Sequence, residues 1–207
     1  MKQLVLASGN PGKIREFEQM LGSLNIEIVP QSTLKITDAE EPHLTFVENA
    51  LAKARHASRL SGLPAFADDS GICVAALNGE PGVHSARYAE GGDGAYFSHT
   101  REAQDVRNNL KLLRELERHE DRRAHYYCVI VLVRHAEDPQ PLIAEGVWHG
   151  EVTAQPRGTN GFGYDPHFYI PALSRTAAEL DAEKKNAVSH RGQALRTLMS
   201  RLRTSDR

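Results

Sequence analysis

The chain has few cysteines and no long apolar run, and each absence removes a class of protein. Its two cysteines, Cys73 and Cys128, lie in separate apolar stretches and lack a CxxC spacing. We therefore expect buried free thiols in a reducing compartment rather than a zinc site or a redox motif. No run reaches the length of a membrane span, and the apolar part of the N-terminus is too short for a signal peptide. These absences predict a cytoplasmic protein with no membrane partner.

An excess of either charge is also absent. Lys plus Arg number 25 and Asp plus Glu 27, for a formal net charge of -2. A broad nucleic-acid surface needs a basic excess, so we expect no nucleic-acid partner, although a local basic pocket is compatible with these numbers. The 207 residues contain no repeat or clear linker, which predicts one domain over residues 1–207 that is built from two lobes.

The order of the predicted elements indicates an α/β fold. An apolar strand over 3–7 is followed by a glycine-bearing turn, an amphipathic helix over 13–24 and a second strand near 26–28. This spacing is typical of a βαβ start. Hydrophobic periodicity predicts further helices over 45–60, 101–118 and 176–184 and from about residue 189, and adjacent strands over 125–135 and 141–150. Residues 78–97 and 158–166 are predicted loops because they are rich in glycine.

The first candidate site is SGNPGK, residues 8–13, between the first strand and the first helix. A glycine-bearing turn at a helix N-terminus exposes backbone N–H groups that attract phosphate, and Lys13 adds a positive charge. The Walker A spacing is absent, because Lys13 is followed by Ile14 and the earlier glycine is missing. An ordinary turn with a solvated Lys13 therefore stays open as an alternative.

Two carboxylates, Asp68 and Asp69, lie side by side between apolar residues. Burying a charge is costly unless it is paired, so these flanks favour a function. If the chain stays extended, the side chains point to opposite faces, and only one faces a substrate while the other holds a turn. Glu40 and Glu41 form a second acidic pair, for which a solvated charge run is the alternative. Carboxylates of this kind are typical ligands of Mg²⁺ together with substrate phosphates.

Cationic and aromatic residues further along the chain supply candidates for ligand binding. Lys53 shares a helix face with Asn49, although an exposed helical lysine is common. In GFGYDP, glycines on both sides of Phe162 allow close approach to the backbone, and its ring offers a stacking surface for a base. Asp165, extended before Pro166, accepts hydrogen bonds from a ligand or caps a turn. A tight structural loop with Phe162 in the core is the alternative.

The segment SHRG places cations where a helix disfavours them. Ser189 is a predicted N-cap, which puts His190 and Arg191 in the first turn of the last helix. The helix dipole slightly disfavours cations there, so their presence suggests that they donate hydrogen bonds to a ligand. A surface-exposed Arg191 is the alternative.

Taken in order, these segments resemble the inosine triphosphate pyrophosphatase family. The resemblance rests on SGNPGK, EE before TFVENALAKA, DDSG, PGVHSARY, GFGYDP and SHRG, and it extends from Leu4 to about Leu202. It implies a homodimer with an elongated mixed β-sheet, flanking helices and two lobes around a central substrate cleft. It also implies Mg²⁺-dependent hydrolysis of the purine nucleoside triphosphates ITP, dITP and XTP to the monophosphate and pyrophosphate, which removes deaminated purines from the nucleotide pool.

Residue roles follow from the same resemblance. Asp69 would be the catalytic proton acceptor and, with Glu41, a metal ligand; Ser70 would touch substrate, and Asp68 would support the site. The triphosphate would be held by Ser8, Gly9, Asn10, Pro11, Gly12, Lys13 and Lys53. The nucleoside end would be held by Phe162, Gly163, Tyr164, Asp165, Lys185, His190 and Arg191. The chain departs from the family at 91–104, which is longer than usual, and at Asn160, where glycine is frequent.

Two other functions compete with this interpretation. A septum-inhibitor-like nucleotide pyrophosphatase of related fold would act on pyrimidine or modified nucleotides, and the SHRG and GFGYDP segments argue against it. A catalytically silent sensor of purine triphosphates would bind without turnover. For the inosine triphosphate pyrophosphatase that the chain resembles, base selection has a physical basis: donors from His190 and Arg191 would match the O6 acceptor of hypoxanthine and xanthine and oppose the amino group of adenine.

Overall fold

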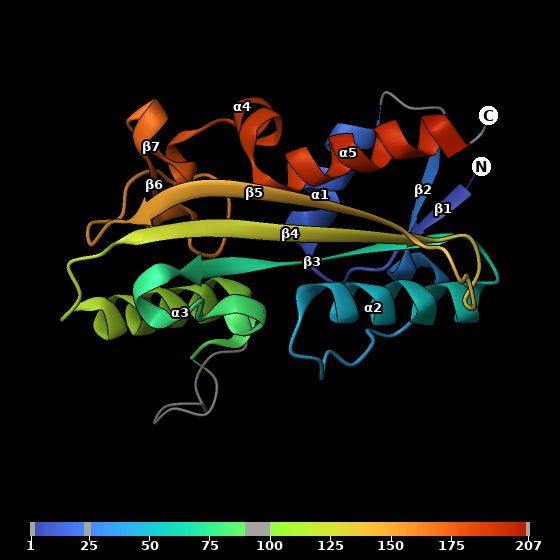
Figure 1. The fold of residues 1–207 in the computed structure, drawn as a ribbon, viewed down its shortest axis with the longest axis horizontal. Helices are drawn as coiled ribbons and strands as arrows, with labels where there is room; N and C mark the ends of the chain where they lie inside the picture. The colour runs from blue at the N-terminus through green and yellow to red at the C-terminus, as the bar shows by residue number, and fades with distance from the viewer. Residues whose placement is uncertain (1–2, 23–25, 90–99, 206–207) are drawn as a thin grey trace. The chain divides into compact units, whose positions relative to one another are not determined.

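The computed structural model describes residues 3–22, 26–89 and 100–205. Its strands form a seven-stranded sheet in the order β2-β1-β3-β4-β5-β6-β7 (Figure 1). The strands are β1 (Gln3–Leu6), β2 (Glu27–Pro30), β3 (Ala65–Val74), β4 (Arg123–Val133), β5 (Leu142–Val152), β6 (Phe168–Ile170) and β7 (Arg175–Thr176). The α-helices are α1 (Pro11–Leu21), α2 (Phe46–Ser61), α3 (Arg101–Leu116), α4 (Ala182–Val188) and α5 (His190–Ser205).

The sheet is mixed. Strand β1 pairs in parallel with β2, where Leu4 lies opposite Ile28, and with β3, where Leu6 lies opposite Phe66. At the other edge β6 pairs antiparallel with both β5 and β7. The predicted α/β class, with a mixed sheet and flanking helices, is confirmed. The single domain, the two lobes and the central cleft stay predictions. No helix in the described part of the chain is long and apolar enough to cross a membrane.

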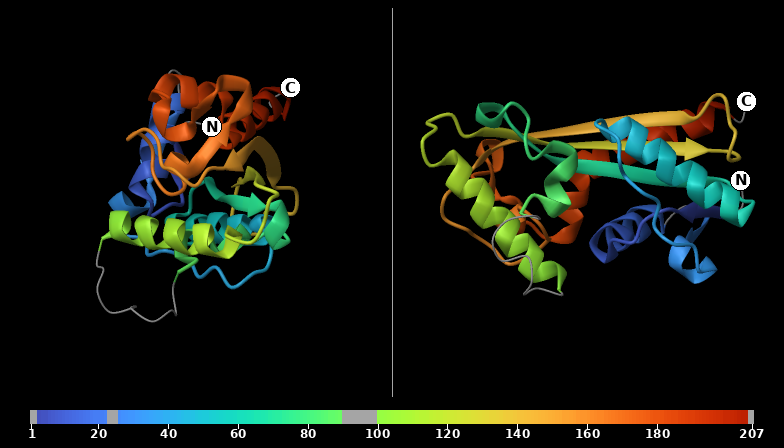
Figure 2. Two further views of the ribbon diagram at one scale, coloured as in Figure 1. Left: turned by 90° about the vertical axis from the view of Figure 1, so that its left-hand side faces the viewer. Right: turned by 90° about the horizontal axis from the view of Figure 1, so that it is seen from below.

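The chain divides into two compact units. The first unit comprises Met1–Asp69, Cys128–Gly146 and His190–Arg207. The parts of β1, β3 and β4 in this unit are buried on both faces, and alternate residues face different helices because side chains alternate along a strand. One face packs against α1 and α5 through a core of Leu4, Leu6, Phe17, Leu21, Phe66, Cys128, Ile130, Leu132, Ala144, Ala194, Leu195 and Leu198. Helix α2 covers the opposite face with the small residues Ala50, Ala54 and Ala57 (Figures 1 and 2).

The second unit comprises Ser70–Tyr127 and Val147–Ser189. Its core is formed by the parts of β3, β4 and β5 that belong to this unit, by α3 and by the chain that follows β5. An aromatic group dominates this core: the rings of Tyr126 and Phe168 have centroids 4.5 Å apart, and those of Trp148 and Phe168 5.3 Å apart. Leu112 and Leu116 of α3 and Ile72 and Val74 of β3 belong to the same buried cluster.

Several predicted elements need correction. Asp68 and Asp69 do not hold a turn, because β3 continues through them to Val74. The helix predicted over 176–184 is a 3₁₀ turn at Ala177–Glu179 followed by α4, whose N-cap is Asp181. The loop predicted over 78–97 contains a 3₁₀ helix at Gly82–Arg87, and most of the long segment 91–104 lies outside the described residues. Of the two free thiols, Cys128 is buried and Cys73 is partly exposed.

Candidate active site

The turn after β1 is organised by its own side chains. Pro11 starts α1, and Asn10 is the N-cap: its side-chain oxygen accepts from the N–H of Gly12 at 2.9 Å and of Lys13 at 3.4 Å. The Ser8 hydroxyl in turn accepts from the N–H of Asn10 at 3.2 Å. Helix N-termini leave such N–H groups unsatisfied, and a capping oxygen fulfils the same need as a phosphate oxygen. The predicted turn at a helix N-terminus is therefore present, with Asn10 as the acceptor of its N–H groups, and phosphate binding there stays a prediction.

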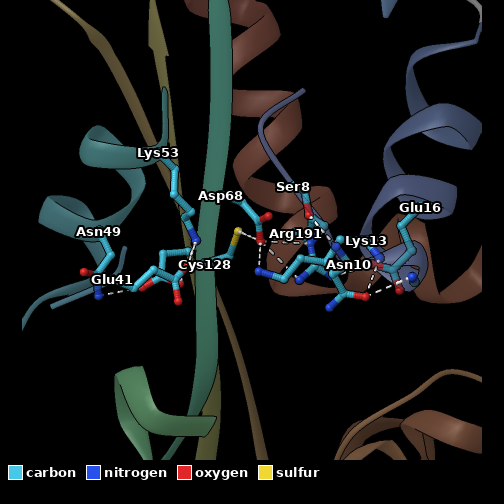
Figure 3. A network of polar contacts seen from close by, with 12 residues as sticks. Ser8, Asn10, Lys13, Glu16, Glu41, Asn49, Lys53, Asp68, Cys128 and Arg191 are labelled. Carbon is cyan, nitrogen blue, oxygen red and sulfur yellow. Dashed lines mark hydrogen bonds and ion pairs between the residues drawn. The ribbon is translucent and has the colours of Figure 1, made fainter. Parts of the chain in front are cut away.

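Asp68 is the centre of the first group of charges. Its side chain is fully buried, and Oδ2 lies 2.9 Å from the Lys13 ammonium and 3.3 Å from both Nε and Nη2 of Arg191 (Figure 3). Arg191 also forms an ion pair with Glu16 of α1. Burial alone would raise the pKa of Asp68, but Lys13 and Arg191 outweigh it and hold the pKa well below its usual range. Asp68 is thus an ionised counter-ion for two cations.

Asp69 belongs to a second group. Its Oδ1 lies 3.2 Å from the ammonium of Lys53, and its Oδ2 accepts from the Asn49 side chain at 3.3 Å. Lys53 also contacts Glu41, so one ammonium bridges the two carboxylates that were predicted as metal ligands (Figure 3). Burial, followed by repulsion from Glu41 and Asp68, raises the pKa of Asp69 despite the opposing charges of Lys53 and Lys13. Burial alone would lower the pKa of Lys53, but the negative charges of Asp69 and Glu41 outweigh it and raise this pKa.

The two groups lie on opposite faces of β3. Asp68 has the parity of Phe66, whose ring packs edge-on against Phe17 of α1, so it faces α1 and α5. Asp69 has the parity of Ala65 and Ala67 and faces α2, where Asn49 and Lys53 lie one turn apart. The prediction that an extended chain separates the two carboxylates is confirmed. Adjacent groups whose surroundings shift their pKa values in opposite directions are typical of acid–base sites.

The residues around Asp69 fit a divalent cation of the Mg²⁺ type. In the described part of the chain, no group of three or more His, Cys, Asp or Glu side chains is arranged to hold a metal by itself. Glu41 and Asp69 nevertheless converge on one cationic centre, the Lys53 ammonium. Two carboxylates are what Mg²⁺ usually takes from a protein when substrate phosphates and waters complete its coordination. The oxygen-only donor set and its geometry therefore suit a metal that arrives with a phosphate ligand.

The GFGYDP loop lies in the second unit and is held together by Asp165. Asp165 Oδ2 accepts from the N–H of Phe162 at 2.9 Å and from the Lys185 ammonium at 2.6 Å. Lys185 also lies 4.8 Å above the centroid of the Phe162 ring. The flanking glycines have left-handed backbones, with φ of 77° at Gly161 and 65° at Gly163, so the loop conformation itself requires them. Four of the predicted nucleoside-binding residues, Phe162, Gly163, Asp165 and Lys185, are thus brought together, with Tyr164 buried beside them.

The SHRG segment joins the two last helices. Ser189 has an extended backbone and directly precedes α5, so His190 and Arg191 lie in its first turn as predicted. Arg191 is buried rather than surface-exposed, and its contacts are with Asp68 and Glu16. A Cβ atom added to Gly146 of β5 would lie 2.0 Å from the His190 carbonyl oxygen, so α5 begins in direct contact with that strand. The roles predicted for His190, Arg191 and Ser70 at a nucleoside stay predictions.

Two residues in the group of charges around Asp68, Glu16 and Cys128, were not predicted from the sequence. Glu16 neutralises Arg191 from a position 175 residues away, a pairing that no local pattern reveals. Its place on α1, three residues after Lys13 on the same helix face, is the signal that could have found it. The Cys128 thiol lies 4.0 Å from Asp68 Oδ2, and burial raises the pKa of this thiol well above its ordinary value. Cys128 therefore stays protonated and donates weakly to the carboxylate.

Together, these features define an α/β protein in which lysine and carboxylate side chains gather on both faces of one buried strand. The sequence pattern of the Ham1 family matches residues 4–201, and the chain belongs to that family.

Relatives of known name cover almost the whole chain. It is 62% identical over 203 residues to a dITP/XTP pyrophosphatase of Ralstonia nicotianae, covering 98% of each chain. It is 60% identical over 200 residues to one of Burkholderia pseudomallei, covering 97% of this chain and 93% of the relative. A HAM1 protein from Coxiella burnetii has a solved structure that matches with a TM-score of 0.86 at 49% identity, over 99% of this chain and 100% of that one.

Proposed function

We propose that this chain is a Mg²⁺-dependent nucleoside triphosphate pyrophosphatase that hydrolyses ITP, dITP and XTP to the monophosphate and pyrophosphate. Relatives named dITP/XTP pyrophosphatase support the reaction class and the substrates. The observation that carries the proposal is Asp69, a buried carboxylate with a raised pKa that shares a lysine with Glu41. By this reaction the protein removes deaminated purine nucleotides from the nucleotide pool.

The triphosphate would be held mainly by the first unit. Lys13 and Lys53 supply charge, and the N–H groups of Gly12 and Lys13, now capped by Asn10, supply donors at the start of α1. A phosphate oxygen bound at this turn would take over the hydrogen bonds that the Asn10 side chain accepts. Ser8, Gly9 and Pro11 would shape the turn around that phosphate. Asp68 would keep Lys13 and Arg191 in place, because it contacts both.

Glu41 and Asp69 would hold Mg²⁺ together with phosphate oxygens. A bound Mg²⁺ would neutralise phosphate charge and lower the pKa of a coordinated water. Lys53 now occupies the space between these two carboxylates. When the carboxylates bind a metal, the Lys53 ammonium would be released to contact the phosphates, which need cations as charge moves to the leaving group.

Asp69 would accept the proton in the chemical step. One water adds across the anhydride between the α- and β-phosphates, the bond to the bridging oxygen breaks, and one water proton passes to Asp69. A raised pKa suits this role, because a base works best when its pKa approaches the working pH. Asn49, which donates to Asp69 Oδ2, would fix the orientation of the carboxylate during the transfer. Ser70, the next residue of β3, would touch the substrate.

The nucleoside end would be held by Phe162, Gly163, Tyr164, Asp165 and Lys185, with His190 and Arg191 as the donors predicted for the keto bases. The Phe162 ring offers a stacking face for a purine. An O6 acceptor would satisfy the donors of the site, whereas the 6-amino group of adenine would leave buried donors unpaired at a large cost. Guanine carries O6 but adds a 2-amino donor that would oppose a donor at that edge. We further propose that the active protein is a cytoplasmic homodimer, as the family resemblance implies.

A substrate panel tests the proposed function. The protein is incubated with ITP, dITP, XTP, ATP and GTP, with and without Mg²⁺, and pyrophosphate is measured separately from orthophosphate. We expect Mg²⁺-dependent pyrophosphate release from ITP, dITP and XTP and little from ATP or GTP. Orthophosphate as the first product would move the cleavage to the γ-phosphate and refute the mechanism. Binding without turnover would identify a sensor, and turnover confined to pyrimidine nucleotides would identify a septum-inhibitor-like enzyme.

A further inference from the structure

Two side chains of α3 hold both backbone groups of Gly163, in the middle of the GFGYDP loop. Asp105 Oδ2 accepts from the N–H of Gly163 at 2.8 Å. Asn109, one turn further along α3, donates from Nδ2 to the carbonyl oxygen of Gly163 at 2.9 Å. Helix and loop belong to the same unit and are separated by more than fifty residues of sequence. The two contacts form a clamp, which we define as Asp105, Asn109 and Gly163.

The clamp is well suited to fix a backbone conformation. The Asn109 amide also donates to the backbone carbonyl of Asp105 at 2.8 Å, and Asn109 is buried, so its orientation is fixed within the helix. Gly163 has a φ of 65°, a conformation that glycine adopts freely but does not prefer by itself. Holding the N–H and the carbonyl at once selects this conformation from those open to a glycine.

The same helix also supports the loop at a second place. Tyr164 donates from its hydroxyl to the Ser85 carbonyl at 2.8 Å, and Asn108 of α3 donates to that same carbonyl at 3.2 Å. Asn109 therefore contacts Gly163 directly, and Asn108 shares the Ser85 carbonyl as an acceptor with the Tyr164 hydroxyl. Buried polar groups are costly unless they are satisfied, and here the Nδ2 groups of both amides donate to backbone carbonyls outside α3, whereas Asn109 Oδ1 has no hydrogen-bond partner among the described residues.

We propose that Asp105 and Asn109 are positioning residues for purine discrimination, acting through Gly163 on the presentation of Phe162 and Asp165. The proposal rests on the proposed function, in which this loop holds the base of a purine nucleoside triphosphate. Phe162 precedes the clamped residue directly, and its N–H is held by Asp165 from the other side. A small rotation at Gly163 would therefore move the ring relative to the Asp165–Lys185 pair and weaken contacts that depend on the base.

Hydrogen exchange tests the clamp without any substrate. Asp105→Ala and Asn109→Leu each remove one of the two contacts to Gly163. Asp105→Asn keeps an acceptor for the Gly163 N–H. Arg114→Ala is a matched control on the exposed side of α3. We expect faster amide exchange over residues 158–166 in the first two variants, at least about fivefold, and wild-type exchange in the other two. Unchanged exchange in Asp105→Ala would overturn the clamp.

Steady-state kinetics test whether the clamp contributes to purine discrimination. For Asp105→Ala and Asn109→Leu we expect KM for ITP to rise about tenfold with kcat changed less than about threefold. The ratio of kcat/KM for ITP to that for ATP should fall by a similar factor, and Asp105→Asn should restore both values. A purely structural role would lower the active fraction, reducing kcat with KM and the base ratio unchanged, and that result would overturn the proposal.

The proposed function can fail separately. If the wild-type protein releases no pyrophosphate from any purine triphosphate, binding of IMP measured by calorimetry replaces kinetics. Weaker IMP binding by Asp105→Ala than by Arg114→Ala would then uphold the clamp as a nucleoside-positioning device while the pyrophosphatase proposal falls. Equal binding of IMP by the two variants, or no binding of IMP by the wild-type protein, would overturn the proposed role of the clamp.

Discussion

Asp68 and Asp69 are consecutive residues of β3 whose carboxylates contact different lysines, Lys13 at 2.9 Å and Lys53 at 3.2 Å. Both residues are almost fully buried, with exposed fractions of 1% and 6%. Yet the pKa of Asp68 is lowered and that of Asp69 is raised. One strand thus presents a carboxylate with a lowered pKa on one face and a carboxylate with a raised pKa on the other.

The opposite pKa shifts predict that the two carboxylates differ in how much they contribute to stability. Asp68→Asn removes the carboxylate that pairs with Lys13 and one of the two carboxylates that pair with the buried Arg191, and we expect a loss of about 3 kcal/mol in the free energy of unfolding. Asp69→Asn removes a charge that the fold disfavours, and Lys53 keeps Glu41 as a partner, so we expect a change of less than about 1 kcal/mol. Urea denaturation at pH 7 measures both. Equal losses in the two variants would contradict the assignment.

The difference between wild type and Asp68→Asn should depend on pH. A carboxyl group whose pKa is lower in the folded than in the unfolded state stabilises the fold above its unfolded pKa, and this contribution fades as the pH falls toward the folded value. We therefore expect the two denaturation curves to approach each other below about pH 4. A gap that widens toward acid would show that Asp68 is not held ionised.

Lys53 and a metal compete for the same carboxylates. Lys53→Met leaves Glu41 and Asp69 without their shared cation. We expect Mg²⁺ or Mn²⁺ to bind the nucleotide-free variant about tenfold more tightly than the wild type, while kcat/KM for ITP falls because a phosphate contact is lost. Calorimetry gives the metal affinity, and Lys35→Met, at an exposed lysine, is the control. Weaker metal binding by Lys53→Met would refute the competition.

The close packing around Gly146 predicts that a larger residue at this position destabilises the fold. A methyl group at this position would lie 2.0 Å from the His190 carbonyl oxygen and 2.7 Å from the Ala194 nitrogen. Since both contacts are backbone atoms, α5 must shift as a whole, and we expect Gly146→Ala to lower the free energy of unfolding by about 2 kcal/mol. Thermal unfolding measures the loss. The matched substitution is Gly79→Ala, whose added Cβ meets nothing within 4 Å, although its φ of 92° carries some strain. A smaller loss for Gly146→Ala than for Gly79→Ala would contradict the close packing.

The turn between β4 and β5 depends on Asp138. Its carboxylate accepts from the Arg134 side chain at 2.8 Å and from the N–H groups of Arg134 at 3.0 Å and Gln140 at 2.9 Å, and these hydrogen bonds lower its pKa well below the usual range. We expect Asp138→Asn to cost about 1.5 kcal/mol at pH 7, a cost that disappears in acid as the wild-type group is protonated. The neighbouring exposed residue gives the control, Glu137→Gln. A cost that is as large at about pH 2 as at pH 7 would show that the charge is not the cause.

Much of the site follows from local sequence patterns. The alternation of side chains along a strand separates Asp68 from Asp69, and helical spacing puts Asn49 and Lys53 on one face, where both contact Asp69. The helix predicted from residue 13 begins at Pro11, with Asn10 as its N-cap, and the predicted turn lies directly before it. These features are determined within a few residues of chain, so a single sequence is enough to predict them.

The other contacts of the site join residues that are far apart in the sequence. No local pattern shows that Arg191 pairs with Glu16 and Asp68, or that Asp105 and Asn109 reach Gly163. The β3 strand continues through two aspartates, residues usually depleted in strands, because lysines and an arginine from three helices neutralise them. Tertiary ion pairs overrode the local preference for a turn at this point.

In the proposed mechanism, Asp69 accepts the proton of the attacking water. The most direct test compares kcat and KM for ITP in the wild-type protein and Asp69→Asn with saturating Mg²⁺, after unfolding curves show that both are folded. We expect kcat of Asp69→Asn to fall about a thousandfold, since the amide cannot take the proton. A variant that retains more than about a tenth of the wild-type kcat would contradict the assignment of Asp69 as the base.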